Sequence, residues 1–115
     1  MERTVGGAGM VAAGGFFGAV SRYAVDLASG DVTGVGTLLV NVVGCFLLGV
    51  AVTRSLTVKV RLFVATGFVS SFTTYSAFAA DAVTLGTAMG TGYVLVSYAA
   101  GFIAAIGGLA AGRRL

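Results

Sequence analysis

Five serine and threonine residues fall within the seven positions 70–76, which read Ser-Ser-Phe-Thr-Thr-Tyr-Ser. This segment lies near the middle of the third of four long apolar stretches. The hydrocarbon core of a membrane holds no water, so clustered polar groups persist there only beside a cavity, a bound ion or a packed partner. If the helix is broken within residues 70–74, the freed backbone carbonyls would suit a small cation. The segment is therefore a candidate ion site.

An aromatic side chain shares a helix face with this segment. Phe78 follows Tyr75 by three residues and Thr74 by four, so the three side chains project from one face. An aromatic ring has a positive edge, which can partly replace the lost hydration water of a small anion. Aromatic pairs at helical spacing also serve simple packing, and the pattern alone leaves both interpretations open.

The second apolar stretch carries a polar pair near its centre. Asn41 and Thr37 lie one turn apart and share a face. A buried amide offers two N–H donors to a dehydrated anion, whereas the structural alternative is an interhelical hydrogen bond worth about 0.6 kcal/mol. The residue types favour neither interpretation over the other.

In the fourth stretch, Tyr93, Ser97 and Gly101 recur every four residues and form a stripe of hydroxyls that ends in bare backbone. Such hydroxyls can line an ion path or bond back to carbonyls of their own helix. Arg22, near the end of the first stretch, can attract an anion electrostatically or extend its charge to the membrane surface.

The composition indicates the kind of protein that positions these residues. Of the 115 residues, 57% are hydrophobic and 10% charged, and the mean hydropathy is +1.01. A membrane-spanning helix needs about 20 mainly apolar residues. The sequence therefore predicts an all-α integral membrane protein with four transmembrane helices, at about 5–25, 32–52, 62–85 and 89–111. The connections are too short to fold separately, so we expect a single domain spanning residues 1–115.

The residue types argue against an enzyme. The chain has no histidine and a single cysteine, and it lacks the paired carboxylates of acid–base catalysis and the usual metal-ligand sets.

The basic residues are strongly biased to one side of the predicted helices. With four spans, both termini and the 53–61 connection share a side, which carries six cations: Arg3, Arg54, Lys59, Arg61, Arg113 and Arg114. The other side has Asp26, Asp31 and Asp81, with Arg22 as its cation. The positive-inside rule then predicts a multi-pass protein of the cell membrane with cytoplasmic N- and C-termini. Six charges spread over three short segments are too dispersed to predict nucleic-acid binding.

Three motifs, at residues 14–23 (GGFFGAVSRY), 36–44 (GTLLVNVVG) and 67–78 (GFVSSFTTYSAF), follow one another in an order that resembles the Fluc/CrcB fluoride channel family. The resemblance covers almost the whole chain. It implies an antiparallel dual-topology dimer with two fluoride pathways at the subunit interface. It also implies a structural sodium ion at the dimer centre, held by backbone carbonyls where the third helix is broken near the bilayer midplane.

Carried onto this chain, the resemblance makes the carbonyls of Ser70 and Thr73 the sodium ligands. The resemblance also implies the residues of the fluoride pathway, which would be Asn41, Thr74, Tyr75, Phe78, Tyr93 and Ser97. Arg22 and Thr37 are added to the expected pathway because of their own chemistry, described above. The chain departs from the family pattern at Ser70 and Ser71, where the family usually has two glycines, and at Tyr75, where it typically has phenylalanine. A carbonyl ligand tolerates a side-chain change when the backbone dihedrals remain accessible.

The expected function is a passive fluoride-selective channel that lets cytoplasmic fluoride leave the cell. One sequence inserts both ways when its cationic bias is near zero, so the bias found here suggests an antiparallel heterodimer with a homologous subunit of opposite bias, although a homodimer remains possible.

Two alternatives belong to other classes. A small multidrug antiporter of similar size needs a carboxylate deep within a span, and Asp26 and Asp81 lie near span ends. A non-conducting assembly subunit would explain the many glycines but not a series of polar residues through three spans.

Overall fold

The computed structural model describes residues 5–30 and 32–115, which form helices and no strand, so the all-α prediction is confirmed. Arg3 and Asp31, which entered the charge argument, lie outside the described residues. The elements in order are α1 (Val5–Ser29), α2 (Val35–Thr53), α3 (Val58–Arg61), the π-helix η1 (Leu62–Val69), α4 (Ser70–Phe72) and α5 (Tyr75–Arg114).

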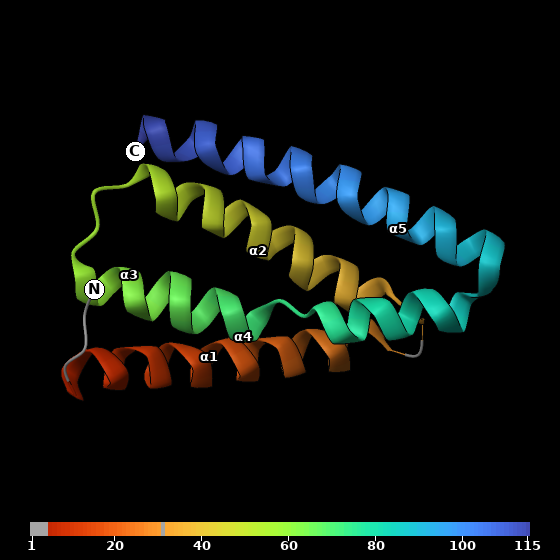
Figure 1. Ribbon diagram of the computed structural model, residues 1–115, viewed down its shortest axis with the longest axis horizontal. Helices are drawn as coiled ribbons and strands as arrows, with labels where there is room; N and C mark the ends of the chain where they lie inside the picture. Colours follow the sequence, from red (N-terminus) through yellow and green to blue (C-terminus); the bar gives the residue numbers. More distant parts are fainter. Residues whose placement is uncertain (1–4, 31) are drawn as a thin grey trace.

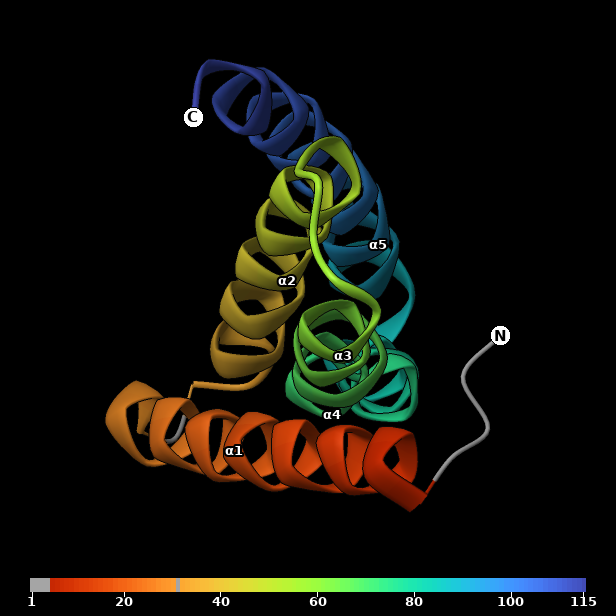
Figure 2. The ribbon, with the colours of Figure 1, turned by 90° about the vertical axis from the view of Figure 1, so that its left-hand side faces the viewer.

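The helices run lengthwise along a molecule whose longest dimension is 46 Å (Figure 1). α1 and α2 run in opposite directions, after which α3, η1 and α4 form a nearly continuous rod that runs in the same general direction as α1 and packs across it. α5 first continues that direction and then turns back along α2. Viewed from the end, α1 lies beneath the α3–η1–α4 rod, while α2 packs against the returning part of α5 (Figure 2).

The reversal within α5 is made at Gly86. Its φ of 89° and ψ of −179° lie outside helical values and separate residues 75–85 from residues 87–114. A positive φ is accessible to glycine because it has no Cβ. The expected connection at 86–88 is thus reduced to a single residue.

The other expected helix bounds also shift. The first helix extends to Ser29 rather than 25, and the second begins at Val35 rather than 32. The rod that contains the third stretch begins at Val58, where the Thr57 hydroxyl accepts a hydrogen bond from the Val60 N–H at 3.3 Å. A side chain that caps the first turn in this way stabilises a helix start. Helix bounds predicted from hydrophobic residues alone do not take such a cap into account.

Two parts of the described chain have the length and apolar composition needed to cross a membrane. They are α2 and the 57-residue run from Val58 to Arg114, which contains the π-helix, α4 and the Gly86 turn.

Glycines allow the helix backbones to approach closely. A Cβ at Gly14 or Gly18 of α1 would overlap the carbonyl oxygens of Phe63 and Phe68 on the neighbouring rod. Between α2 and the returning part of α5, a Cβ on Gly49 would lie 2.5 Å from the Ala105 oxygen. Helices in lipid gain no hydrophobic energy by associating, so such close backbone contact is their main source of attraction.

Candidate functional site

The helical rod is interrupted at Thr73 and Thr74. Both residues have extended backbone, with φ/ψ of −83°/161° and −151°/127°. α4 ends just before them at Phe72 and α5 begins just after them at Tyr75. The Thr74 hydroxyl accepts a hydrogen bond from the Ala77 N–H at 3.2 Å and so caps the start of α5.

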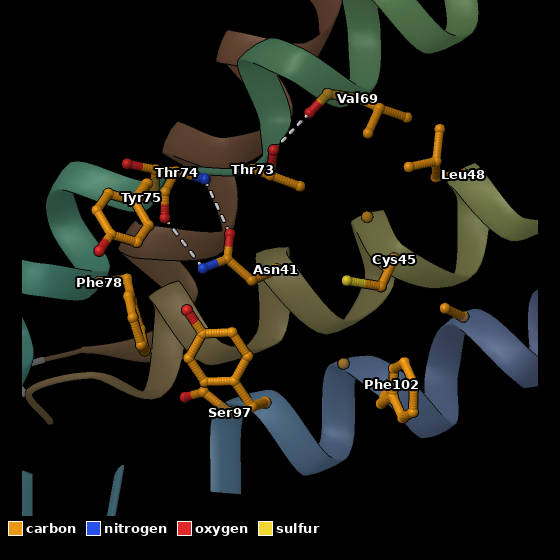
Figure 3. A pocket seen from close by; sticks show the side chains of 14 residues that line it. Asn41, Cys45, Leu48, Val69, Thr73, Thr74, Tyr75, Phe78, Ser97 and Phe102 are labelled. Atoms are coloured by element: carbon orange, nitrogen blue, oxygen red, sulfur yellow. Dashed lines mark hydrogen bonds between the residues drawn. The ribbon is translucent and has the colours of Figure 1, made fainter. Parts of the chain in front are cut away.

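Asn41 of α2 binds both backbone polar groups of Thr74. Its Oδ1 accepts from the Thr74 N–H at 2.8 Å, and its Nδ2 donates to the Thr74 carbonyl at 3.0 Å (Figure 3). In a continuous helix the Thr74 N–H would bond to the carbonyl of Ser70, four residues earlier. The amide therefore takes the place of a helical hydrogen bond and stabilises the interruption.

These bonds bear on the two roles that the sequence left open for Asn41. An amide nitrogen carries two N–H donors, and one of them is given to Thr74. Within residues 5–30 and 32–115 the structure shows no partner for the other donor. Asn41 thus forms the interhelical hydrogen bond that was one of its two expected roles, and its second N–H remains as a donor for the other, ligand binding.

A groove of about 460 Å³ opens beside the interruption. α2 forms one wall, the interruption and the first turn of α5 form the second, and the returning part of α5 forms the third (Figure 3). Its lining is mostly apolar, with a polar minority: Asn41, Thr73, Thr74, Tyr75, Ser97 and Tyr98. Binding sites for small ligands commonly combine an apolar wall with a few such convergent polar groups.

Phe78 is the aromatic residue buried in this wall, at 8% exposure. Its ring centroid lies 5.8 Å from that of Tyr75 and 5.6 Å from that of Tyr93. The Tyr93 hydroxyl in turn donates to the Gly34 carbonyl at the start of α2, at 3.0 Å. Tyr75 and Phe78 are in ring contact, as expected from their spacing, and Tyr93 joins them in a larger aromatic cluster.

Ser97 differs from a serine that bonds back to its own helix. Its Oγ is buried and has no hydrogen-bond partner among the described residues, and the side chain lines the groove (Figure 3). A buried hydroxyl without a partner costs free energy, so an unpaired donor facing a groove indicates a place for a polar ligand or water.

The residues singled out in the sequence divide into three groups in space. Asn41, Thr73, Thr74, Tyr75, Phe78 and Ser97 line the groove. Thr37 and Tyr93 lie next to it, since Tyr93 contacts the Phe78 ring and the buried Thr37 hydroxyl donates to Asp81 at 2.7 Å. Arg22 lies on α1, which contributes no residue to the groove, and the exposed Ser70 side chain points to the Ala65 carbonyl at 3.4 Å.

Sequence reasoning missed two residues of this region. Asp81 was treated as a span-end carboxylate, yet it receives the Thr37 hydrogen bond; its position three residues after Phe78 and seven after Thr74 could have placed it on the same face. Tyr98 lines the groove and contacts Phe78. No local pattern marks Tyr98, because it stands beside the 93–97–101 stripe rather than within it.

The described residues contain no group of three or more His, Cys, Asp or Glu side chains that could hold a metal ion. A cation near the interruption would have to be held by backbone and hydroxyl oxygens. Such hard oxygen donors suit alkali and alkaline-earth ions rather than transition metals.

Apolar helices of membrane length, together with a groove whose wall is an interrupted helix, are features that a small helical membrane protein would have. The family described as CrcB-like protein, Camphor Resistance (CrcB), matches residues 9–109, and the chain belongs to this family.

Three curated relatives illustrate what the chain is similar to. The "Fluoride-specific ion channel FluC 1" of Natronomonas pharaonis is 44% identical over 102 residues, covering 84% of this chain and 86% of the relative. The "Fluoride-specific ion channel FluC" of Agrobacterium fabrum is 40% identical over 119 aligned positions, covering 92% and 95%. The "Fluoride-specific ion channel FluC 1" of Haloarcula marismortui is 46% identical over 98 residues, covering 81% and 75%. These relatives are named as channels and not as enzymes.

The two hydrogen bonds between Asn41 and Thr74 predict that substituting Asn41 weakens the protection of the Thr74 amide against hydrogen exchange. Asn41→Leu removes both bonds to Thr74 and leaves its backbone groups unpaired, which should destabilise the interruption by about 1–3 kcal/mol. Amide hydrogen exchange at Thr74 in detergent micelles should then be faster by about fivefold or more.

The matched control is Thr84→Val, which removes a hydroxyl bond to the Ala80 carbonyl within α5 and should leave Thr74 exchange unchanged. Equal amide exchange at Thr74 in the wild type and in Asn41→Leu would contradict the conclusion that Asn41 stabilises the interruption.

Proposed function

We propose that this protein is a subunit of a fluoride-selective ion channel that lets cytoplasmic fluoride leave passively down its gradient. The proposal rests on the family and on the printed names of relatives that align over most of the chain. The structural observation that carries it is the interruption at Thr73 and Thr74, braced by Asn41 and opening on a groove with unpaired donors. In acidic surroundings protonated fluoride enters a cell and dissociates, and the channel releases the trapped anion.

Fluoride is small and tightly hydrated, so its passage requires substitutes for water. The groove offers the second N–H of Asn41, the unpaired hydroxyl of Ser97 and the exposed side chain of Tyr75. The first turn of α5 begins in the same wall, and the positive end of a helix dipole favours an anion. Larger halides fit such a narrow set of contacts poorly.

Fluoride contacts are also proposed beyond the groove. Thr37 and Tyr93 adjoin its aromatic wall and would extend the polar track toward the start of α2, and the Thr74 hydroxyl and the Phe78 ring edge would lie along the path. For Arg22 we propose only an electrostatic role, because α1 lines no part of the groove.

We further propose four membrane crossings. At about 1.5 Å per residue, α1 is about 38 Å long and α2 about 29 Å, compared with a hydrocarbon core of about 30 Å. The rod from Val58 to Leu85 and residues 87–114 would make the other two crossings. One subunit leaves the groove open, so an antiparallel dimer would enclose the pathway.

A sodium ion is proposed at the interruption, held by the carbonyls of Ser70 and Thr73. The observation in its favour is that the Thr74 N–H bonds to Asn41 rather than to the Ser70 carbonyl, so that oxygen lacks its usual helical donor. Carbonyl oxygens are suitable ligands for a hard cation. When bound, the ion would place a fixed positive charge at the break.

The partner is proposed to be a homologous subunit of opposite charge bias. α2 ends, α3 begins and α5 ends at the same end of the molecule (Figure 1). The exposed basic residues near these ends are Arg54, Lys59, Arg61, Arg113 and Arg114. This bias would insert the chain in one orientation, with its C-terminus in the cytoplasm.

Fluoride efflux from liposomes tests the function. The chain, reconstituted alone and with any homologous subunit found beside it, should release fluoride rapidly while chloride is retained. Phe78→Ile should lower fluoride flux about tenfold, the factor expected if the ring edge contributes about 1–1.5 kcal/mol. Phe16→Ile, at an exposed position of α1 away from the groove, is the control and should conduct normally.

Drug-coupled proton flux in this assay would favour the antiporter instead, and silence of the complete assembly would favour a scaffold subunit. Unchanged flux in Phe78→Ile would contradict the role given to that ring.

Sodium binding predicts a cation-specific stability. If sodium is present at about 100 times its dissociation constant, it should stabilise the assembly by about 2.7 kcal/mol. The apparent Tm should then be higher in sodium chloride than in potassium chloride of equal ionic strength, and fluoride flux should fall when sodium is withdrawn. Equal Tm and flux in the two salts would exclude a structural sodium ion.

Expression of the chain alone, with a cleavable tag at its C-terminus, tests the orientation. We expect the tag to be protected from protease added outside intact cells and cleaved after lysis. Equal populations on the two faces would indicate a dual-topology homodimer and remove the proposed heterodimer.

A further inference from the structure

Three tyrosines surround the Phe78 ring, and they are held differently. The Tyr93 hydroxyl donates to the Gly34 carbonyl at the start of α2, which holds that ring in place, whereas Tyr75 is the first residue of α5 and is 73% exposed. Tyr98 approaches from the returning part of α5, with its ring centroid 6.0 Å from that of Phe78 and the two planes at 89°. This T-shaped arrangement is the geometry that ring quadrupoles prefer.

Tyr98 is exposed in the single subunit, although it contacts a buried ring. It is 65% exposed, whereas Phe78 is 8% exposed. Within residues 5–30 and 32–115 its hydroxyl forms no hydrogen bond, so the ring contact with Phe78 is its specific interaction.

The usual role of an exposed membrane tyrosine does not fit Tyr98. Tyrosines gather at the two membrane surfaces, where the hydroxyl meets water. Tyr98 lies twelve residues after Gly86 and sixteen before Arg114, which places it about 18 Å and about 24 Å from the two ends of this helix. Such a depth is beyond the reach of a side chain that anchors at the surface, and Tyr98 faces the groove instead.

We propose that Tyr98 is a positioning residue that fixes the orientation of the Phe78 ring in the ion path, and this inference rests on the proposed fluoride channel function. A phenylalanine ring presents either a positive edge or a negative face to an ion, depending on its rotation. Tyr98 packs perpendicular to Phe78, and turning the Phe78 ring would replace this favourable contact with a less favourable one. The hydroxyl of Tyr98 is not needed for this effect.

Two substitutions separate the ring of Tyr98 from its hydroxyl. Tyr98→Phe keeps the ring and should conduct fluoride within twofold of the wild type. Tyr98→Leu removes the ring and should lower fluoride flux about fivefold and reduce the preference for fluoride over chloride, since an aromatic pair worth about 1 kcal/mol corresponds to about that factor. Tyr23→Leu, which removes an equally exposed tyrosine (64%) from α1, is the matched control and should leave both unchanged.

A double-mutant cycle tests whether Tyr98 acts through Phe78. In a Phe78→Ile background, Tyr98→Leu should cause little further loss of flux, because the ring that it positions is already absent. The positioning role would be overturned if Tyr98→Leu lowered flux by the same factor in the Phe78→Ile background as in the wild type. Full flux in Tyr98→Leu alone would also overturn it. A wild-type assembly that releases no fluoride would contradict the channel function itself.

A spectroscopic measurement follows the ring without any flux. In protein carrying labelled phenylalanine, the Phe78 ring signal is identified by its absence from Phe78→Ile. Tyr98→Leu should change its chemical shift and speed its ring flips, whereas Tyr98→Phe and Tyr23→Leu should not. An unchanged Phe78 signal in Tyr98→Leu would overturn the proposal even if flux were altered.

Discussion

The architecture depends on the paired hydrogen bonds between the Asn41 side chain and the backbone of Thr74. Away from water, an unpaired N–H and an unpaired carbonyl each cost free energy, so an interrupted helix tends to close again. One amide presents a donor and an acceptor in the spacing that a peptide group needs. By satisfying both groups from a different helix, it makes the extended conformation of Thr73 and Thr74 stable and leaves the Ser70 carbonyl without its helical donor.

Close helix packing brings that amide within reach. Gly44 lies one turn after Asn41 on α2, and a Cβ there would overlap the Thr73 methyl group. On the other side of the rod, Gly14, Gly18 and Gly67 let α1 approach η1 at backbone distance. The π-helix just before the interruption belongs to the same rod, and such wide turns occur often at functional sites. The glycine content of the chain therefore serves the geometry of the site as well as association in lipid.

The groove combines two environments within one small chain. Its polar lining includes Asn41 and Ser97, and Cys45, Leu48 and Phe102 line its other part (Figure 3). Next to Phe78, Tyr93 continues the aromatic cluster, and its hydroxyl bonds to the Gly34 carbonyl at the start of α2. Thr37 of α2 donates to Asp81. An ion that loses its hydration would meet oriented dipoles and ring edges rather than full charges, which limits how tightly it is held.

Local features of the sequence determined the class of the protein and identified residues 70–76 as the segment that contains the helix interruption. Hydropathy and length depend only on neighbouring residues, so an all-helical membrane protein could be predicted, and the hydroxyl cluster at 70–76 marked the place where the helix is interrupted. Helical periodicity placed Tyr75 and Phe78 on one face for the same reason. The fluoride assignment came from ordered motifs, and the names of the relatives agree with it.

Only the tertiary structure decided which groups meet. Asn41 and Thr74 are 33 positions apart, and Thr37 and Asp81 are 44 apart, so no local pattern could pair them. The place of Tyr98 depends on the turn at Gly86 and on the way α5 packs along α2. Such contacts follow from the packing of whole helices, in which a rotation of one helix moves every side chain on it, and this is information that spacing along a single chain does not contain.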